Sequence, residues 1–113
     1  MTIEPLTKTD FDEIIRDIAD FWGSDRTLQL HNPTLINEFG NTAYVIRDGG
    51  RVAAYFFGFY SQTEPVAYGN LVGVRKSYQR HGHGMRLWNH FIAAARKHGC
   101  REIKCITSTA KGL

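Results

Sequence analysis

Apolar residues in the first quarter of the chain recur at every third or fourth position, at Phe11, Ile14, Ile15, Ile18 and Trp22. This spacing predicts one amphipathic helix that buries a single apolar face. Thr9, followed three residues later by Asp12, predicts the N-cap of that helix, and Gly23 predicts its end. A short strand over residues 2–6 is predicted before it.

Residues 32–40 carry the signals of a second, shorter helix: an Asn-Pro start, apolar residues at positions 35, 36 and 39, and a terminating glycine. Runs rich in Val, Ile, Tyr and Phe then predict strands over residues 42–47, 51–60, 66–74 and 101–107. Asp48-Gly49-Gly50 predicts a tight hairpin between the first two of these strands.

Helical spacing returns over residues 82–98. One predicted apolar stripe holds Met85, Trp88, Ile92 and Ala95, with Leu87, Phe91 and Ala94 beside it. The predicted order is therefore β-α-α-β-β-β-α-β. A β-α-β unit joins parallel strands by a right-handed crossover, whereas a hairpin joins antiparallel strands. The sequence thus predicts an α/β fold with a mixed sheet and helices on both faces.

The chain has 113 residues, which suits one domain over residues 1–113. No apolar run approaches the roughly 18–20 residues of a membrane span. The N-terminus lacks the basic start and apolar middle of a signal peptide. Cys100 and Cys105 are the only cysteines, so we expect free thiols and a reducing, cytoplasmic location.

Charge is divided unevenly along the chain. Residues 1–74 contain five lysines and arginines against ten acidic residues, a net charge of −5. Residues 75–104 contain eight basic residues and one acidic residue, a net charge of +7. This basic segment suits a polyanionic ligand, although a solvated helix face has the same composition. Aromatic residues are not interleaved with these charges, which argues against nucleic acid as the partner.

The turn between the strand at 66–74 and the helix at 82–98 has the most specific pattern, Gln79-Arg80-His81-Gly82-His83-Gly84-Met85. Glycines let backbone N–H groups approach a ligand closely. The first turn of the helix adds unpaired N–H donors and the positive end of the helix dipole. Together these features predict a phosphate site. Glycines that only make a tight turn are the alternative.

This Gln-Arg-x-Gly-x-Gly pattern after a strand resembles motif A of the GNAT superfamily, the acetyl-CoA-dependent N-acyltransferases. The resemblance extends over residues 3–107 and is most specific over residues 71–85. It implies that the backbone of Val72, Gly73 and Val74 binds the pantetheine arm of acetyl-CoA. It also implies that the pyrophosphate is surrounded by the N–H groups of Gln79, Arg80, His81, Gly82, His83, Gly84 and Met85, with a charge contact from Arg80.

The resemblance does not supply catalytic residues. The family often has a carboxylate base on the strand before motif A, and a tyrosine acid in a C-terminal strand-helix-strand that we expect to be missing here. The strand at 66–74 offers only Asn70 and Tyr68, so the catalytic residues are unknown. The sequence supports an N-acetyltransferase with an unidentified small-molecule or peptide amine as acceptor. A non-catalytic CoA-binding or protein-interaction module is the alternative.

Other ligand classes fit the sequence less well. A Rossmann fingerprint needs a small residue where Leu87 stands, and a Walker loop needs Gly-Lys-Ser/Thr, which does not occur. His81-x-His83 and the nearby Cys100 match no closed four-ligand site, so no metal is expected.

The last predicted strand raises the question of assembly. In the family, two more strands follow it and extend the sheet. We therefore expect the strand at 101–107 to present an unpaired edge that a second copy covers in a homodimer.

Overall fold

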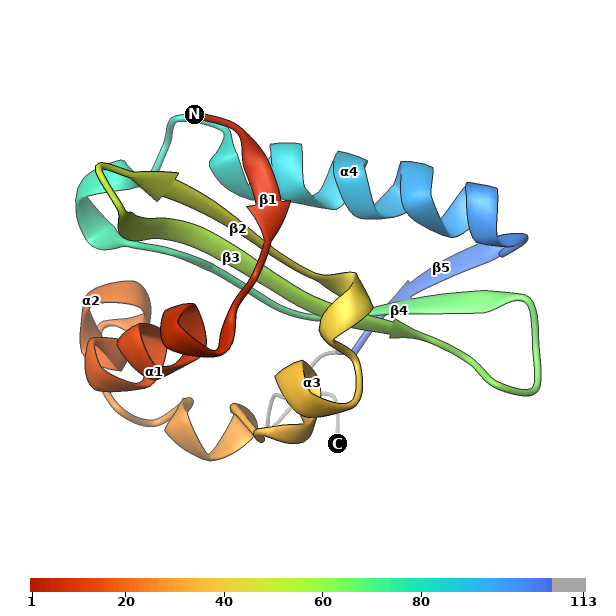
Figure 1. Cartoon of the computed structure of the whole chain (residues 1–113), viewed down its shortest axis with the longest axis horizontal. Coiled ribbons are helices and arrows are strands. Elements are labelled where there is room, and N and C mark those ends of the chain that lie inside the picture. The colour runs from red at the N-terminus through yellow and green to blue at the C-terminus, as the bar shows by residue number, and fades with distance from the viewer. Residues whose placement is uncertain (107–113) are drawn as a thin grey trace.

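The computed structural model describes residues 1–106 and places one five-stranded sheet between two layers of helices (Figure 1). The strands lie in sequence order across the sheet. They are β1 (Ile3–Pro5), β2 (Ala43–Asp48), β3 (Arg51–Tyr60), β4 (Val66–Val74) and β5 (Glu102–Cys105). Neighbours from β1 to β4 are antiparallel, and β4 pairs with β5 in parallel. The predicted mixed sheet is therefore confirmed, and β3 and β4 have their predicted bounds; Thr107 lies outside the described residues.

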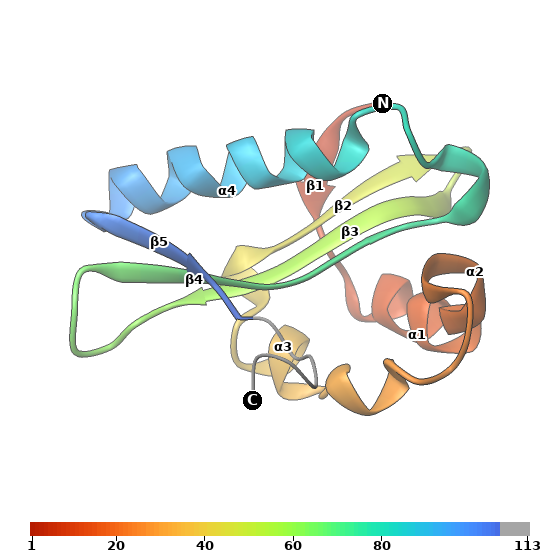
Figure 2. The ribbon, with the colours of Figure 1, turned by 180° about the vertical axis from the view of Figure 1, so that it is seen from behind.

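Helices cover both faces of the sheet, as Figures 1 and 2 show from opposite sides. In the described part of the chain, one face carries α4 (His83–His98) alone. The other carries α1 (Lys8–Arg16), α2 (Ile18–Trp22) and the short α3 (Thr34–Asn37). We call these the α4 face and the α1–α3 face. The hairpin between β2 and β3 turns at Gly49 and Gly50, both with positive φ, as the sequence predicts.

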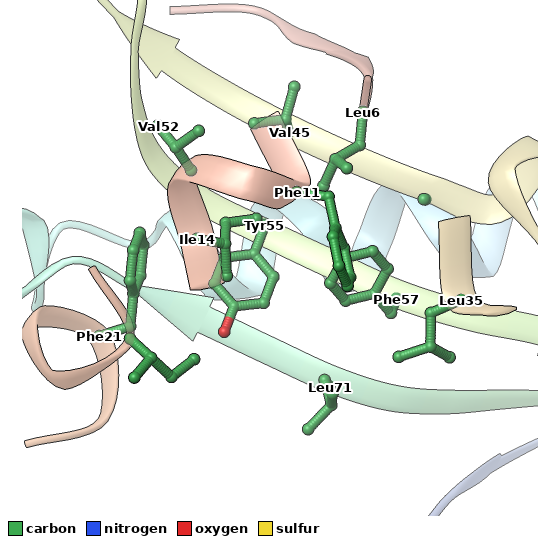
Figure 3. Close-up of a cluster of buried hydrophobic side chains, with 12 residues drawn as sticks. Leu6, Phe11, Ile14, Phe21, Leu35, Val45, Val52, Tyr55, Phe57 and Leu71 are labelled. Atoms are coloured by element: carbon green, nitrogen blue, oxygen red, sulfur yellow. The ribbon is translucent and has the colours of Figure 1, made fainter. Parts of the chain in front are cut away.

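The central strand β3 supports a separate core on each face. Tyr55 points to the α1–α3 face, where its ring centroid lies 5.0 Å from that of Phe21 (Figure 3). Phe56 points to the α4 face, 4.7 Å from the ring of Phe91. Successive strand residues point to opposite faces, so a strand covered on both sides needs a continuous apolar run. This is the pattern of residues 52–57, all of which are buried.

The first helix differs from its prediction in two places. Thr7, not Thr9, is the N-cap, because the Thr7 hydroxyl accepts the Asp10 N–H while the Asp10 carboxylate accepts the Thr7 N–H at 2.8 Å. The helix also breaks at Asp17 (φ −105°, ψ 24°) into α1 and α2. A long-range bond from Arg75 to the Asp17 carboxylate accompanies the break. Gly23 ends α2 with a left-handed φ of 79°, as predicted.

The buried stripe of α4 also differs from the prediction. The fully buried positions are His83, Leu87, Phe91 and Ala95, each four residues from the next. Met85, placed in the main stripe by the sequence, is 64% exposed. Two neighbouring apolar stripes fit a period of 3.6 residues equally well, and the direction in which the helix crosses the sheet selects one of them.

Candidate functional site

Strand β4 loses one of its two partners halfway along its length. Its first half pairs with β5 up to Gly69, whose carbonyl accepts the Ile106 N–H at 2.9 Å. From Leu71 to Val74, within the described part of the chain, only β3 pairs with it. Figure 2 shows β5 turning away from β4 at this point. We call residues 70–74 the open strip, because their side away from β3 has no strand partner in the described part of the chain and can receive an extended ligand.

A β-bulge marks the start of the open strip. Phe57 pairs with Leu71 and Gly58 pairs with Gly69, which leaves Asn70 as an extra residue opposite β3. An extra residue of this kind bends the strand and increases its twist, which separates it from a neighbour that stays straight. The bulge therefore accounts for the divergence of β4 from β5.

Two glycines let side chains pack directly on this part of β4. A Cβ at Gly69 would lie 2.8 Å from two ring carbons of Trp88, which comes from the α4 face. A Cβ at Gly73 would lie 2.6 Å from the hydroxyl oxygen of Tyr55, which comes from the α1–α3 face. Both approaches are closer than real Cβ atoms allow, so each position requires glycine.

The loop after β4 presents six consecutive free N–H groups, from Arg80 to Met85. None of them donates a hydrogen bond to a described residue, and no side chain caps α4. Arg80 (φ 68°) and Gly82 (φ 81°) both have left-handed backbone conformations. That conformation strains an arginine, and alternation of left- and right-handed residues turns successive N–H groups toward one concave point. The loop therefore has the geometry of an anion site.

Gln79 and Gly84 differ in the structure from the pyrophosphate-binding role that the sequence predicts for them. The Gln79 N–H faces the Lys76 carbonyl at 3.4 Å, and its side-chain amide donates to the Val74 carbonyl at 3.1 Å. The run of free donors thus begins after Gln79. A Cβ at Gly84 would lie 3.7 Å from Val72, in ordinary contact. A side chain at Gly84 therefore begins against the sheet rather than in the centre of the anion site.

Positive charge surrounds the free N–H groups. The Arg86 guanidinium donates to the Met1 carbonyl at 2.8 Å, which brings the N-terminal amine toward the start of α4. His83 is buried, and its Nδ1 atom has no hydrogen-bond partner within residues 1–106. Burial lowers the pKa of His83, and the positive charges of Arg86, His81 and the N-terminus lower it further. The negative charge of a bound anion would raise the pKa of His83 again.

A sequence model of the acetyltransferase (GNAT) family matches residues 9–111. The chain belongs to this family. No curated protein matches the chain significantly in sequence.

Solved structures with the same fold cover nearly the whole chain at low sequence identity. A transcriptional regulator from Bacillus halodurans C-125 is 17% identical with a TM-score of 0.71, over 98% of this chain and 84% of that one. A GNAT family acetyltransferase from Brucella melitensis in complex with acetyl-CoA is 14% identical with a TM-score of 0.73, over 96% and 77%. Chaetomium thermophilum Naa20 in complex with a bisubstrate analogue is 16% identical with a TM-score of 0.75, over 99% and 65%.

In this GNAT chain, Arg75 at the end of β4 is buried and structural. Only 1% of its side chain is exposed, and its Nε donates to the Val52 carbonyl at 2.8 Å. Its two other nitrogens bind three carboxylates from the first two helices at 2.9–3.1 Å, those of Glu13, Asp17 and Asp20. The cluster ties the start of the loop to α1 and α2. No local signal links Arg75 to these carboxylates, because they lie 55–62 residues before it in the chain.

An open cleft of 620 Å³ lies between α2 and the loop. Asp20 and Trp22 line it from α2, and Lys76 and Gln79 line it from the loop. Behind it, the Trp22 indole N–H donates to the Tyr55 hydroxyl at 2.6 Å. The sequence pattern placed Trp22 on the buried face of the first helix and did not identify the cleft.

No residue of β4 is an evident general base. Tyr68 stacks on Phe59 with 5.5 Å between ring centroids, and β4 carries no carboxylate. Asn70, at the bulge, cannot take up a proton. Within residues 1–106, no three His, Cys, Asp or Glu side chains are grouped to hold a metal ion. No helix in that part of the chain is long and apolar enough to cross a membrane. Cys100 and Cys105 are both unpaired.

Proposed function

We propose that this GNAT chain binds acetyl-CoA along the open strip and the loop, and transfers the acetyl group to an amine. The observation that carries the proposal is that the unpaired backbone groups of the strand continue directly into those of the loop. The backbone groups of Val72 and the Val74 N–H face away from β3, and this row leads along the strand into the loop, where the N–H groups from Arg80 to Met85 have no partner among the described residues. An extended amide-containing arm suits the strip, and a pyrophosphate suits the loop. Similar solved proteins carry acetyl-CoA or a bisubstrate analogue, which supports the assignment.

The electrostatics of the loop favour a diphosphate over a neutral ligand. The N-terminus of α4 carries roughly half a positive charge from aligned peptide dipoles. Its free N–H groups would face the oxygen atoms of a pyrophosphate bound there, and Arg80, Arg86 and the N-terminal amine would add full charges nearby. Binding would therefore place the phosphates of the cofactor beside cations that form no salt bridge with any carboxylate of residues 1–106.

Replacing Gly84 with aspartate is expected to weaken acetyl-CoA binding by at least about tenfold. The new carboxylate would stand in the first turn of α4 and repel the nearby pyrophosphate, an effect of about 1–2 kcal/mol at a helix terminus. Isothermal titration calorimetry measures it. Gly84→Ala is the matched control, because a methyl group there makes only ordinary contacts with Val72 and Val74.

Equal binding by the wild type, Gly84→Asp and Gly84→Ala would place the cofactor elsewhere. No binding by the wild type at millimolar acetyl-CoA would remove the proposed function altogether. Thiol release with a panel of amines then separates the two candidate functions. Release supports an acetyltransferase. Tight binding without release supports a CoA-binding module, the candidate favoured by the absence of a carboxylate on β4.

The outer edge of β5 supports a further proposal, a homodimer that covers this edge. Ile106 at its end is 40% exposed, and β5 pairs only with β4 in the described chain. Analytical ultracentrifugation at micromolar concentration is expected to show a dimer that Ile106→Lys converts to monomer. Leu28→Lys is the matched control, because Leu28 is also 40% exposed but lies away from β5, before α3. A wild-type monomer would exclude the dimer.

A further inference from the structure

His83 occupies a position in α4 where an apolar side chain would be expected. It begins the buried stripe that continues through Leu87, Phe91 and Ala95, and only 8% of its surface is exposed. An imidazole that is buried in this way must stay neutral or find a partner for its charge. His83 is therefore a buried titratable group at the start of the helix whose N–H groups are free.

The ring of His83 lies on the side of the loop. Side chains of a helix lean toward its N-terminus, so the first residue of α4 leans back over the turn that precedes it. The ring contacts agree with this direction, because the His83 ring centroid lies 6.3 Å from that of Tyr78 and 6.3 Å from that of His81. The imidazole thus lies within the loop that carries the free N–H groups.

One ring nitrogen of His83 has no partner. Among the buried side-chain nitrogen and oxygen atoms of residues 1–106, only His83 Nδ1 and the Thr27 hydroxyl oxygen make no hydrogen bond. Buried polar atoms in folded proteins nearly always have a partner. The neutral ring tolerates the lack of one, because its proton can reside on Nε2 and leave a lone pair on Nδ1. Protonation adds an N–H at Nδ1, and that N–H needs an acceptor.

The groups that face His83 disfavour a second proton on its ring. They are His81 and Tyr78 from the loop, Arg86 from α4, and the N-terminal amine, which lies beside the start of α4 in Figures 1 and 2. Tyr78 donates to Asp48 at 2.5 Å, and His83 itself forms no salt bridge with a carboxylate of residues 1–106. Burial, and then the nearby positive charges, lower the pKa of His83, so its ring is neutral at neutral pH without an anion.

We infer that the His83 imidazole is itself a ligand of the anion: it takes up one proton from solvent when the phosphate groups of the cofactor bind, and the imidazolium holds them together with the free N–H groups. The inference rests on the proposed function and gives the side chain a role beyond that of its own backbone N–H. A phosphate oxygen supplies what the protonated ring lacks, a negative charge nearby and an acceptor. The pKa of His83 is then higher in the complex than in the free protein.

Linkage fixes the direction of the pH dependence. A ligand that raises the pKa of a group binds more tightly when that group is protonated, because the two effects are reciprocal. The affinity for CoA should therefore rise as the pH falls through the pKa of His83 in the complex, and should level off below the pKa of His83 in the free protein. A His83 side chain that only fills space takes up no proton and gives no such rise.

NMR of the histidine rings tests the inference directly on the wild type. The chain has five histidines, and sequential assignment identifies the signals of His83. Titration with and without saturating CoA should show a higher pKa for His83 in the complex. His90 is the matched control, because it is exposed about two turns further along α4, and its pKa should not change. Pantetheine, which has the amide arm but no phosphate, should leave the pKa of His83 unchanged.

Calorimetry measures the same linkage as an affinity. Between about pH 8 and about pH 5.5, the ratio of the CoA affinity of the wild type to that of His83→Gln should increase by about fivefold or more. His81 and the phosphomonoester of CoA titrate in every variant, so the ratio isolates His83. His83→Leu, which extends the apolar stripe of α4, should behave like His83→Gln, whereas His90→Gln should keep the wild-type pH profile. Circular dichroism checks the fold of each variant.

Three results would overturn the inference. They are a pKa of His83 that is unchanged or lower in the CoA complex, an equal rise of that pKa with saturating pantetheine, and the same pH profile of affinity in the wild type, His83→Gln and His83→Leu. If a variant does not fold, the titration of the wild type still decides. Failure of the wild type to bind CoA at any pH would instead remove the proposed function, so the two failures are distinguishable.

Discussion

Replacing Arg75 with methionine is expected to lower the free energy of unfolding by about 3–5 kcal/mol. The side chain is 1% exposed and is shared by the carboxylates of Glu13, Asp17 and Asp20. Methionine fills much of the volume but leaves three negative groups close together without their cation. Small domains have about 5–15 kcal/mol in total, so the variant should lose a large part of its stability. Urea unfolding followed by tryptophan fluorescence measures the change.

Two further variants separate charge from packing at this site. Arg75→Lys keeps the charge but not the forked geometry of the guanidinium. We therefore expect its free energy of unfolding to lie between those of the wild type and Arg75→Met. Arg51→Met is the surface control, because Arg51 is exposed and makes no salt bridge with a described residue; its effect should stay within about 0.5 kcal/mol. An Arg75→Met protein as stable as Arg51→Met would mean that the cluster contributes no net stability.

Replacing Gly73 with alanine is expected to cost about 1–3 kcal/mol of stability, although it adds one methyl group. The new Cβ would lie 2.6 Å from the Tyr55 hydroxyl oxygen and nearer still to two carbons of the ring. Tyr55 has no room to retreat, because it is fully buried and bonded to both Trp22 and His31. Thermal or urea unfolding checks the prediction.

Gly40→Ala supplies the comparison. Gly40 has no positive φ, and a Cβ there would meet nothing closer than the Ile36 Cδ1 atom at 3.6 Å. Alanine should therefore be neutral or stabilising at Gly40, because it restricts only the unfolded chain. If Gly73→Ala and Gly40→Ala had the same stability, Tyr55 would be able to move, and the close packing beneath the open strip would not be a constraint.

Local signals were sufficient for most of the fold. Strand β3 is a continuous apolar run because both of its faces are buried, and its bounds match the prediction. Gly49-Gly50, Gly23 and Gly99 mark turns and helix ends at positive φ, where glycine alone is unstrained. The glycine-containing turn before α4 was identified for the same reason. Each of these features depends on residues that are close in sequence.

The features that the sequence did not reveal depend on partners far along the chain. The break at Asp17 accompanies a bond from Arg75, 58 residues away, and the N-cap at Thr7 is reinforced by Arg47, 37 residues from Asp10. His31 and Tyr55 are 24 residues apart, so neither predicts the other. The bulge at Asn70 follows from register with β3, which no spacing within β4 determines. A single sequence carries no record of such pairings.

The open strip also bears on aggregation. Unpaired strand backbone is the template on which chains add to one another in swapped dimers and fibrils. In the proposed complex the pantetheine arm lies where an extra strand would otherwise add, so the coenzyme shields the protein as well as reacting in it. Stability gained from a ligand grows with its concentration. The concentration of coenzyme A would then affect the fraction of this protein that stays folded as well as the rate of the proposed reaction.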